Sequence, residues 1–172
     1  MRQPAPAFRI LQLFLASTLV ASGCTLSPEH NSPDRVQIPS RDLNKGVHAL
    51  LDRWVSAFES RDLKAVRSIL TEDDRFVWLE DGQARYPNSD AVIAALASFP
   101  QELAFEYRLS DVRIIPISEN AAWAHMITHT EIRRNNAVVS QFAGVVSMLV
   151  QQQHGQWRIV AAHTSNTTRS QR

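Results

Sequence analysis

The chain has 172 residues, a formal net charge of +1 and a hydrophobic share of 44%. This length predicts one domain with processing segments, and the hydrophobic share is enough to build a core. Because the sequence has no basic stripe or cluster, we expect no nucleic acid partner. Five glycines leave little room for a phosphate-binding loop. Cys24 is the single cysteine, which excludes an internal disulfide and a thiolate metal cluster.

Residues 1–23 have the composition of a secretion signal. Arg2 and Arg9 make the start of the chain positive, and residues 10–21 are mainly apolar. This apolar stretch is too short to cross a bilayer as a helix, which takes about 20 residues, but it suits a signal peptide. The small residues Ala21-Ser22-Gly23 come directly before Cys24. We therefore predict a signal peptide over 1–23.

The sequence around Cys24 resembles the lipobox of bacterial lipoproteins, with Ala21 where that motif usually has Leu. The resemblance implies cleavage before Cys24, attachment of lipid to it, and a membrane anchor; buried acyl chains hold a protein firmly. Thr25, rather than Asp, follows the cysteine, which implies a place in the outer membrane of the bacterial cell envelope, facing the periplasm. An ordinary secretion signal with an incidental cysteine is the alternative. Residues 24–42 then form the lipidated end and a proline-containing flexible tether.

Two amphipathic helices are expected at the start of the domain. Apolar residues at spacings of three and four predict the first helix, whose apolar side comprises Leu43, Val47, Leu50, Leu51, Trp54, Val55 and Phe58. Asp62 is a suitable N-cap for a second helix, with Leu63, Val66, Ile69 and Leu70 on its apolar side.

The next segment predicts a short hairpin and a third helix. Residues 76–82 read as an apolar strand and a turn that leads to a second strand near Tyr86. Asn88 or Ser89 can cap a helix over 90–98.

After this helix the hydrophobic period changes to two, which is typical of half-buried strands. The expected strands cover residues 103–109, 111–117, 121–132, 137–151 and 156–165. Three helices followed by a meandering antiparallel sheet indicate an α+β domain.

The last predicted strand, Gly155–Ser165, resembles the closing strand of SnoaL-like proteins in the nuclear transport factor 2-like superfamily. The closest likeness is to domains of unknown function related to the association domain of calcium/calmodulin-dependent kinase II. Earlier segments match in the same order: Arg53-Trp54-Val55, Ala57-Phe58, Arg61-Asp62-Leu63, Thr71-Glu72-Asp73-Asp74 and Asn120-Ala121-Ala122-Trp123. The resemblance covers 43–168, which leaves a tail at 169–172. It implies a cone in which the helices pack on a curved antiparallel sheet, with a pocket at the open end and homodimers through the sheet.

The resemblance implies a largely apolar ligand pocket at that open end. Its expected lining is Trp54, Phe58, Trp78, Met126, Thr128, Val146, Met148, Ala162 and Thr164. The alternative is that these side chains are plain core. The arginines of the kinase association domain fall at Thr128, Met148 and Thr164, so we expect no anion site.

Catalysis on this fold is best understood in ketosteroid isomerase, which needs a carboxylate base and acidic hydroxyl groups. Matched to that enzyme, Trp54 takes the position of the tyrosine that stabilises the enolate, and Leu79 takes the position of the carboxylate base. An indole N–H is only a weak donor, and a leucine side chain cannot accept a proton. Glu80 and Asp81 fall in a predicted turn, where carboxylates are usually solvated. We therefore expect a non-catalytic domain, without a cofactor, that binds a small apolar or weakly polar ligand or an envelope partner. The alternative is an isomerase, cyclase or dehydratase with other catalytic residues.

Three histidines in the predicted strands are candidates for chemistry. His125 and His129 lie four apart on one strand, about 13 Å from each other, so they cannot share one metal ion; we expect no metal site. His163 is a weak catalytic candidate, next to Thr164 and Ser165. Alternation places His163 on the face opposite the pocket, together with Trp157 and Ile159 and beside Trp123. We expect this outer face to pair in a homodimer.

Overall fold

The computed structural model of the chain describes residues 40–167. The predicted signal peptide 1–23, the lipid-attachment residue Cys24, most of the predicted tether and the tail 169–172 lie outside the described residues. None of the helices in the described part is long and apolar enough to span a membrane.

Three helices form, as predicted: α1 is Ser40–Ser60, α2 is Leu63–Ile69 and α3 is Ser89–Ala97. The predicted caps are confirmed at α2 and α3. The Asp62 carboxylate accepts a hydrogen bond from the Ala65 amide at 2.9 Å, and Asn88 Oδ1 accepts one from the Ala91 amide at 2.9 Å. Each cap satisfies an amide of the first helical turn, which otherwise lacks a partner.

Six strands form one sheet, and their bounds are β1 Val77–Glu80, β2 Gln83–Tyr86, β3 Leu103–Ser118, β4 Ala121–Arg134, β5 Ala137–Gln153 and β6 Gln156–Thr167. The strand order is β2-β1-β6-β5-β4-β3. The α+β class is confirmed, but the sheet is mixed rather than wholly antiparallel, because β1 pairs with β6 in parallel. A pairing between segments this far apart in sequence leaves no trace in local periodicity.

Two irregularities change which residues face the core. The predicted strands 103–109 and 111–117 are one strand, β3, interrupted by a register shift at Asp111, which has a φ of 51°. In β6, Leu149 pairs with Ala161 while Val150 pairs with Ile159, so Val160 is an extra residue. This bulge turns Ile159 and Trp157 into the core, and the prediction that they share the outer face with His163 is wrong.

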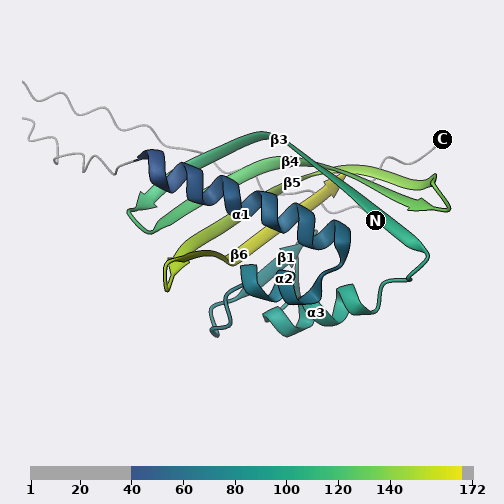
Figure 1. Cartoon of the computed structure of the whole chain (residues 1–172), viewed down its shortest axis with the longest axis horizontal. Helices are drawn as coiled ribbons and strands as arrows, with labels where there is room; N and C mark the ends of the chain where they lie inside the picture. The colour runs from purple at the N-terminus through teal and green to yellow at the C-terminus, as the bar shows by residue number, and fades with distance from the viewer. Residues whose placement is uncertain (1–39, 168–172) are drawn as a thin grey trace, which may run out of the picture. The chain divides into compact units, whose positions relative to one another are not determined.

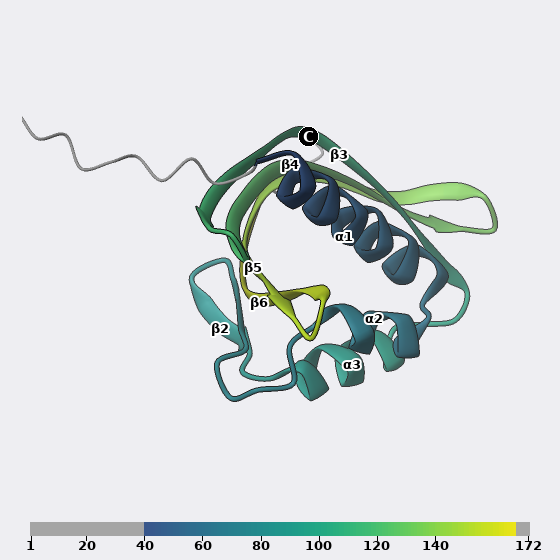
Figure 2. The ribbon, with the colours of Figure 1, turned by 60° about the vertical axis from the view of Figure 1, so that its left-hand side comes forward.

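The sheet curves around α1, which lies along its concave face (Figures 1 and 2). Leu50, Leu51 and Trp54 of α1 pack there against the inner residues of β4, β5 and β6. The contact is close at Gly46, where a Cβ would lie 2.2 Å from Trp157 Nε1. Figure 2 shows α2 and α3 beside the lower end of α1, across from the sheet.

Candidate functional site

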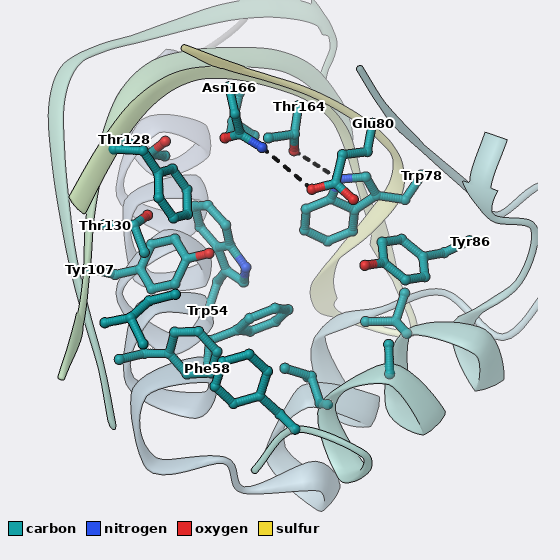
Figure 3. Close-up of a pocket in the computed structure, with 18 residues that line it drawn as sticks. Trp54, Phe58, Trp78, Glu80, Tyr86, Tyr107, Thr128, Thr130, Thr164 and Asn166 are labelled. Carbon is teal, nitrogen blue, oxygen red and sulfur yellow. Dashed lines mark hydrogen bonds between the residues drawn. The ribbon is translucent and has the colours of Figure 1, made fainter. Parts of the chain in front are cut away.

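A cavity of about 260 Å³ lies between α1, α3 and the concave face of the sheet (Figure 3). It is lined by Trp54, Phe58, Trp78, Glu80, Tyr86, Val92, Ala95, Leu96, Phe99, Phe105, Tyr107, Thr128, Thr130, Ile132, Phe142, Val146, Thr164 and Asn166. These residues come from α1, α3, the segment after α3 and all six strands, so the cavity exists only in the assembled domain.

Aromatic rings make up much of the wall. Trp54 and Phe58 are one helical turn apart on α1, with ring centroids 5.9 Å apart. The ring centroid of Trp54 also lies 6.3 Å from that of Trp78 and 5.9 Å from that of Tyr107. These separations fall in the range of favourable aromatic pairs, which fixes the rings relative to one another. The wall is therefore closely packed and mainly apolar.

Five of the predicted pocket residues line the cavity: Trp54, Phe58, Trp78, Thr128 and Thr164. Val146, expected beside them, lines it too. The other three do not line it. Met126 and Met148 are 0% exposed and Ala162 is 4% exposed, and all three belong to the core.

The reason is the position of α1 along the sheet. The methionines sit in rows of β4 and β5 that belong to the core under α1. The cavity begins at the edge of this region, where Val146 pairs with Met126, and continues along the sheet to the row in which Thr130 pairs with Phe142. Alternation predicts which face of a strand is apolar. It does not predict where along the strand a helix stops covering that face.

The sequence interpretation missed the polar residues Glu80, Tyr86, Tyr107, Thr130 and Asn166. Alternation contained a signal for three of them. Glu80, Thr130 and Asn166 each lie two residues after a predicted pocket residue, and therefore share its face.

Glu80 is the most consequential of these. It was expected in a solvated turn, but it ends strand β1 and lines the cavity, while Leu79 is 39% exposed on the opposite face. The Glu80 side chain is 30% exposed. Asn166 Nδ2 donates a hydrogen bond to its carboxylate at 3.4 Å, and Arg85 Nε lies 3.9 Å from the other oxygen.

Two tyrosines face the same space as Glu80. Burial raises the pKa of the Tyr86 phenol, and the negative charge of Glu80 raises it further. Burial likewise raises the pKa of Tyr107, partly offset by a hydrogen bond with Thr130. Both phenols are therefore protonated at neutral pH and act as hydrogen-bond donors.

The two indoles of the cavity differ in their hydrogen bonding. Trp78 Nε1 donates to Thr164 Oγ1 at 2.8 Å. Trp54 is 2% exposed, and its Nε1 has no acceptor among the residues that the structure describes. Figure 3 shows the nitrogen edge of Trp54 turned into the cavity, toward the side that holds Tyr86 and Glu80.

The histidines lie elsewhere. His163 is exposed and does not line the cavity, although its neighbour Thr164 does. His129 Nε2 lies 3.3 Å from Ser110 Oγ, and His125 pairs across the sheet with Ser147. Within residues 40–167 no group of three or more His, Cys, Asp or Glu side chains is placed to hold a metal ion. His163 therefore lies on the face of the sheet away from the cavity, where it pairs with Leu79.

Residues 47–169 match the family described as the SnoaL-like domain. No curated protein shows a significant sequence match to the chain. Among solved structures, a conserved protein from Planctomyces limnophilus aligns with a TM-score of 0.66 at 18% identity, over 74% of this chain and 98% of that one. A nuclear transport factor 2-like superfamily protein from Salmonella enterica aligns with a TM-score of 0.65 at 14% identity, over 76% of this chain and 95% of that one.

A third similar structure carries an enzyme's name. A putative scytalone dehydratase from Novosphingobium aromaticivorans aligns with a TM-score of 0.64 at 13% identity, over 75% of this chain and 87% of that one. At these identities the likeness concerns the fold alone, and the same fold carries many functions.

Proposed function

We propose a function from the premise that this chain belongs to the SnoaL-like domain family. The domain binds a small, mainly apolar molecule in its aromatic cavity without converting it, and a lipid on Cys24 holds it at the cell envelope. The observation that carries the binding proposal is the wall of eight aromatic side chains: Trp54, Phe58, Trp78, Tyr86, Phe99, Phe105, Tyr107 and Phe142.

The physical argument is one of burial and shape. Removing apolar surface from water contributes about 25 cal/mol per Å², and a cavity that exists before binding needs little reorganisation. Concave sites lined mainly by apolar and aromatic side chains, with a few polar groups, are the usual form of small-molecule pockets. A cavity of about 260 Å³ with a mainly aromatic wall therefore supports a ligand site rather than imperfect packing.

The test closes the cavity from the α3 side. Ala95 lines the cavity and its neighbour Ala94 is exposed, so the two positions form a matched pair. In equilibrium dialysis with 2-acetylnaphthalene as the probe, Ala95→Phe should lower the affinity at least tenfold, because the new ring occupies the space of the probe. Ala94→Phe should leave the affinity within a factor of two. Equal affinities for both variants would reject this cavity as the site.

The envelope anchor is proposed from the sequence around Cys24, which lies outside the described residues. The apolar stretch 10–21 and Ala21-Ser22-Gly23 before the cysteine support it. Replacing Cys24 with Ser should move the protein from the membrane to the soluble fraction, with loss of lipid mass on the amino-terminal peptide. An unchanged partition and an unmodified cysteine in the parent chain would refute the anchor.

The domain is also proposed to pair with a second copy through the outer face of the sheet. Ile115, Ile117, Trp123 and Val145 are large apolar residues exposed on that face. Ile115 pairs with Trp123, and Trp123 with Leu149, so the apolar residues run across neighbouring strands. A soluble monomer rarely exposes such a row.

One observation favours a second candidate function, an enzyme that moves a proton. Glu80 is a carboxylate on the cavity wall, facing hydrogen-bond donors on Tyr86 and Trp54. Glu80 could take a proton from the carbon beside a bound carbonyl while a donor stabilises the enolate oxygen. Binding remains the first candidate because the carboxylate is held by Asn166 and is reached by water.

The two candidates differ in one measurable reaction. If Glu80 acts as a base, the acetyl methyl protons of 2-acetylnaphthalene exchange for deuterium in heavy water, and Glu80→Gln abolishes the exchange without loss of binding. If the domain only binds, exchange with the parent protein equals that in buffer. Proton NMR of the probe measures both outcomes.

A further inference from the structure

We infer that the ligand of this cavity is a neutral carbonyl compound whose oxygen accepts a hydrogen bond from Trp54 Nε1. The inference rests on the proposed binding function and adds to it the chemical class and orientation of the ligand. Its starting point is that the Trp54 indole is 2% exposed and has no acceptor among the described residues.

A buried donor without a partner is unusual, because leaving it unpaired costs the solvation that it had in water. The other cavity indole shows the usual arrangement, since Trp78 donates to Thr164. Trp54 is not a displaced surface residue: its ring is fixed by Phe58, Trp78 and Tyr107. Its N–H is therefore held in place, turned toward the cavity and without an acceptor among the described residues.

The charge of the wall decides which acceptor is suitable. No Lys or Arg is among the residues that line the cavity in the described part of the chain, while Glu80 is. A carboxylate or phosphate would lose its hydration without gaining a free cation, because Arg85, which lies near the cavity, is already paired with Glu80. An indole has a single N–H, which meets one carbonyl oxygen. The acceptor is therefore neutral, as in a ketone, ester or amide.

The opposite polar group orients the molecule. Figure 3 shows Glu80 and Asn166 across the cavity from the indole of Trp54. Because an ionised Glu80 only accepts hydrogen bonds, a ligand hydroxyl or amine fits beside it. The carbonyl end thus points to α1, and a donor group points to β1 and β6.

The test uses three probes of nearly equal shape: 2-acetylnaphthalene, which has a neutral acceptor; 2-isopropenylnaphthalene, which has none; and 2-naphthoate, which has a charged one. In equilibrium dialysis we expect the ratio of ketone to alkene affinity to fall about tenfold in Trp54→Phe, as for loss of one buried hydrogen bond. The control Trp123→Phe should leave this ratio unchanged, because that indole lies on the outer face of the sheet and does not line the cavity. Naphthoate should bind more weakly than the ketone, and Glu80→Gln should reduce that difference.

A second measurement keeps the test decisive if Trp54→Phe does not fold. The chain has four tryptophans, so the nitrogen-correlated NMR spectrum contains at most four indole N–H signals, and the Trp54 signal is assigned by triple-resonance experiments. The ketone should move this signal downfield, and the alkene should not. Equal shifts from both probes, with an unchanged affinity ratio in Trp54→Phe, would overturn the inference while leaving apolar binding intact. Absence of binding by all three probes would instead overturn the binding proposal and the inference with it.

Discussion

The indole of Trp78 donates a 2.8 Å hydrogen bond to the hydroxyl of Thr164 and thereby joins β1 to β6 on the cavity face. The two residues lie on neighbouring parallel strands, where Trp78 pairs with Ala162 and Glu80 pairs with Thr164. Because β1 is only four residues long, this side-chain contact adds to a small number of backbone hydrogen bonds.

Replacement of Thr164 by Val should therefore destabilise the protein. Valine has the same shape, but it leaves the Trp78 N–H without an acceptor in a buried position, at a cost of about 1–3 kcal/mol. Thr164→Ser keeps the hydroxyl and should lower the free energy of unfolding by less. Urea unfolding followed by tryptophan fluorescence gives both free energies, and equal stability of Val and Ser variants would contradict the prediction.

Gly46 tests a conflict between helix propensity and packing. In an exposed helix, Gly→Ala stabilises by about 1 kcal/mol. At Gly46 of α1, however, the new Cβ would lie 2.2 Å from Trp157 Nε1, and a ring in the core cannot move freely. Overpacking of this kind costs about 1–3 kcal/mol, so Gly46→Ala should lower the free energy of unfolding. A variant more stable than the parent would show that Trp157 can shift.

Asp73 should make stability depend on pH in the acid range. A hydrogen bond from Arg75 lowers the pKa of this carboxyl to about 2, with a further contribution from Thr71. The unfolded chain binds the proton more readily, so the stabilisation is present above about pH 4 and is lost as the pH falls toward 2.

The matched variants are Asp73→Asn and, at the exposed neighbour, Asp74→Asn. The first should destabilise the protein at pH 7 and lose most of this difference at pH 2.5; the second should do neither. The Asp73 side chain is 34% exposed, so we expect screening by solvent to keep the effect at about 1 kcal/mol or less. Denaturant unfolding at the two pH values measures it.

The proposed dimer predicts a specific effect of charge on the outer face. Trp123→Asp should convert the dimer to a monomer in sedimentation velocity, because a buried carboxylate in the interface would lack a partner. Val139→Asp is the control, since Val139 is 52% exposed but lies near the turn between β4 and β5, outside the central rows. If the parent protein sediments as a monomer at tens of micromolar, the proposed pairing is wrong.

Local sequence patterns alone determined the element types and the starts of α2 and α3. Spacings of three and four identified α1, Asp62 and Asn88 identified the starts of α2 and α3, and alternation identified the long strands. These features depend on neighbours within a few residues, so a single sequence contains them. The order of short motifs also led to the correct family.

Only the tertiary structure decided where the cavity is and what lines it. The parallel pairing of β1 with β6 turns Glu80 into the cavity, the bulge at Val160 reverses the facing of Trp157 and Ile159, and α1 covers Met126 and Met148 but not Thr130. Each outcome depends on contacts between segments far apart in the chain. Periodicity predicts which face of a strand is apolar, but the surface that a helix leaves uncovered depends on how both elements pack.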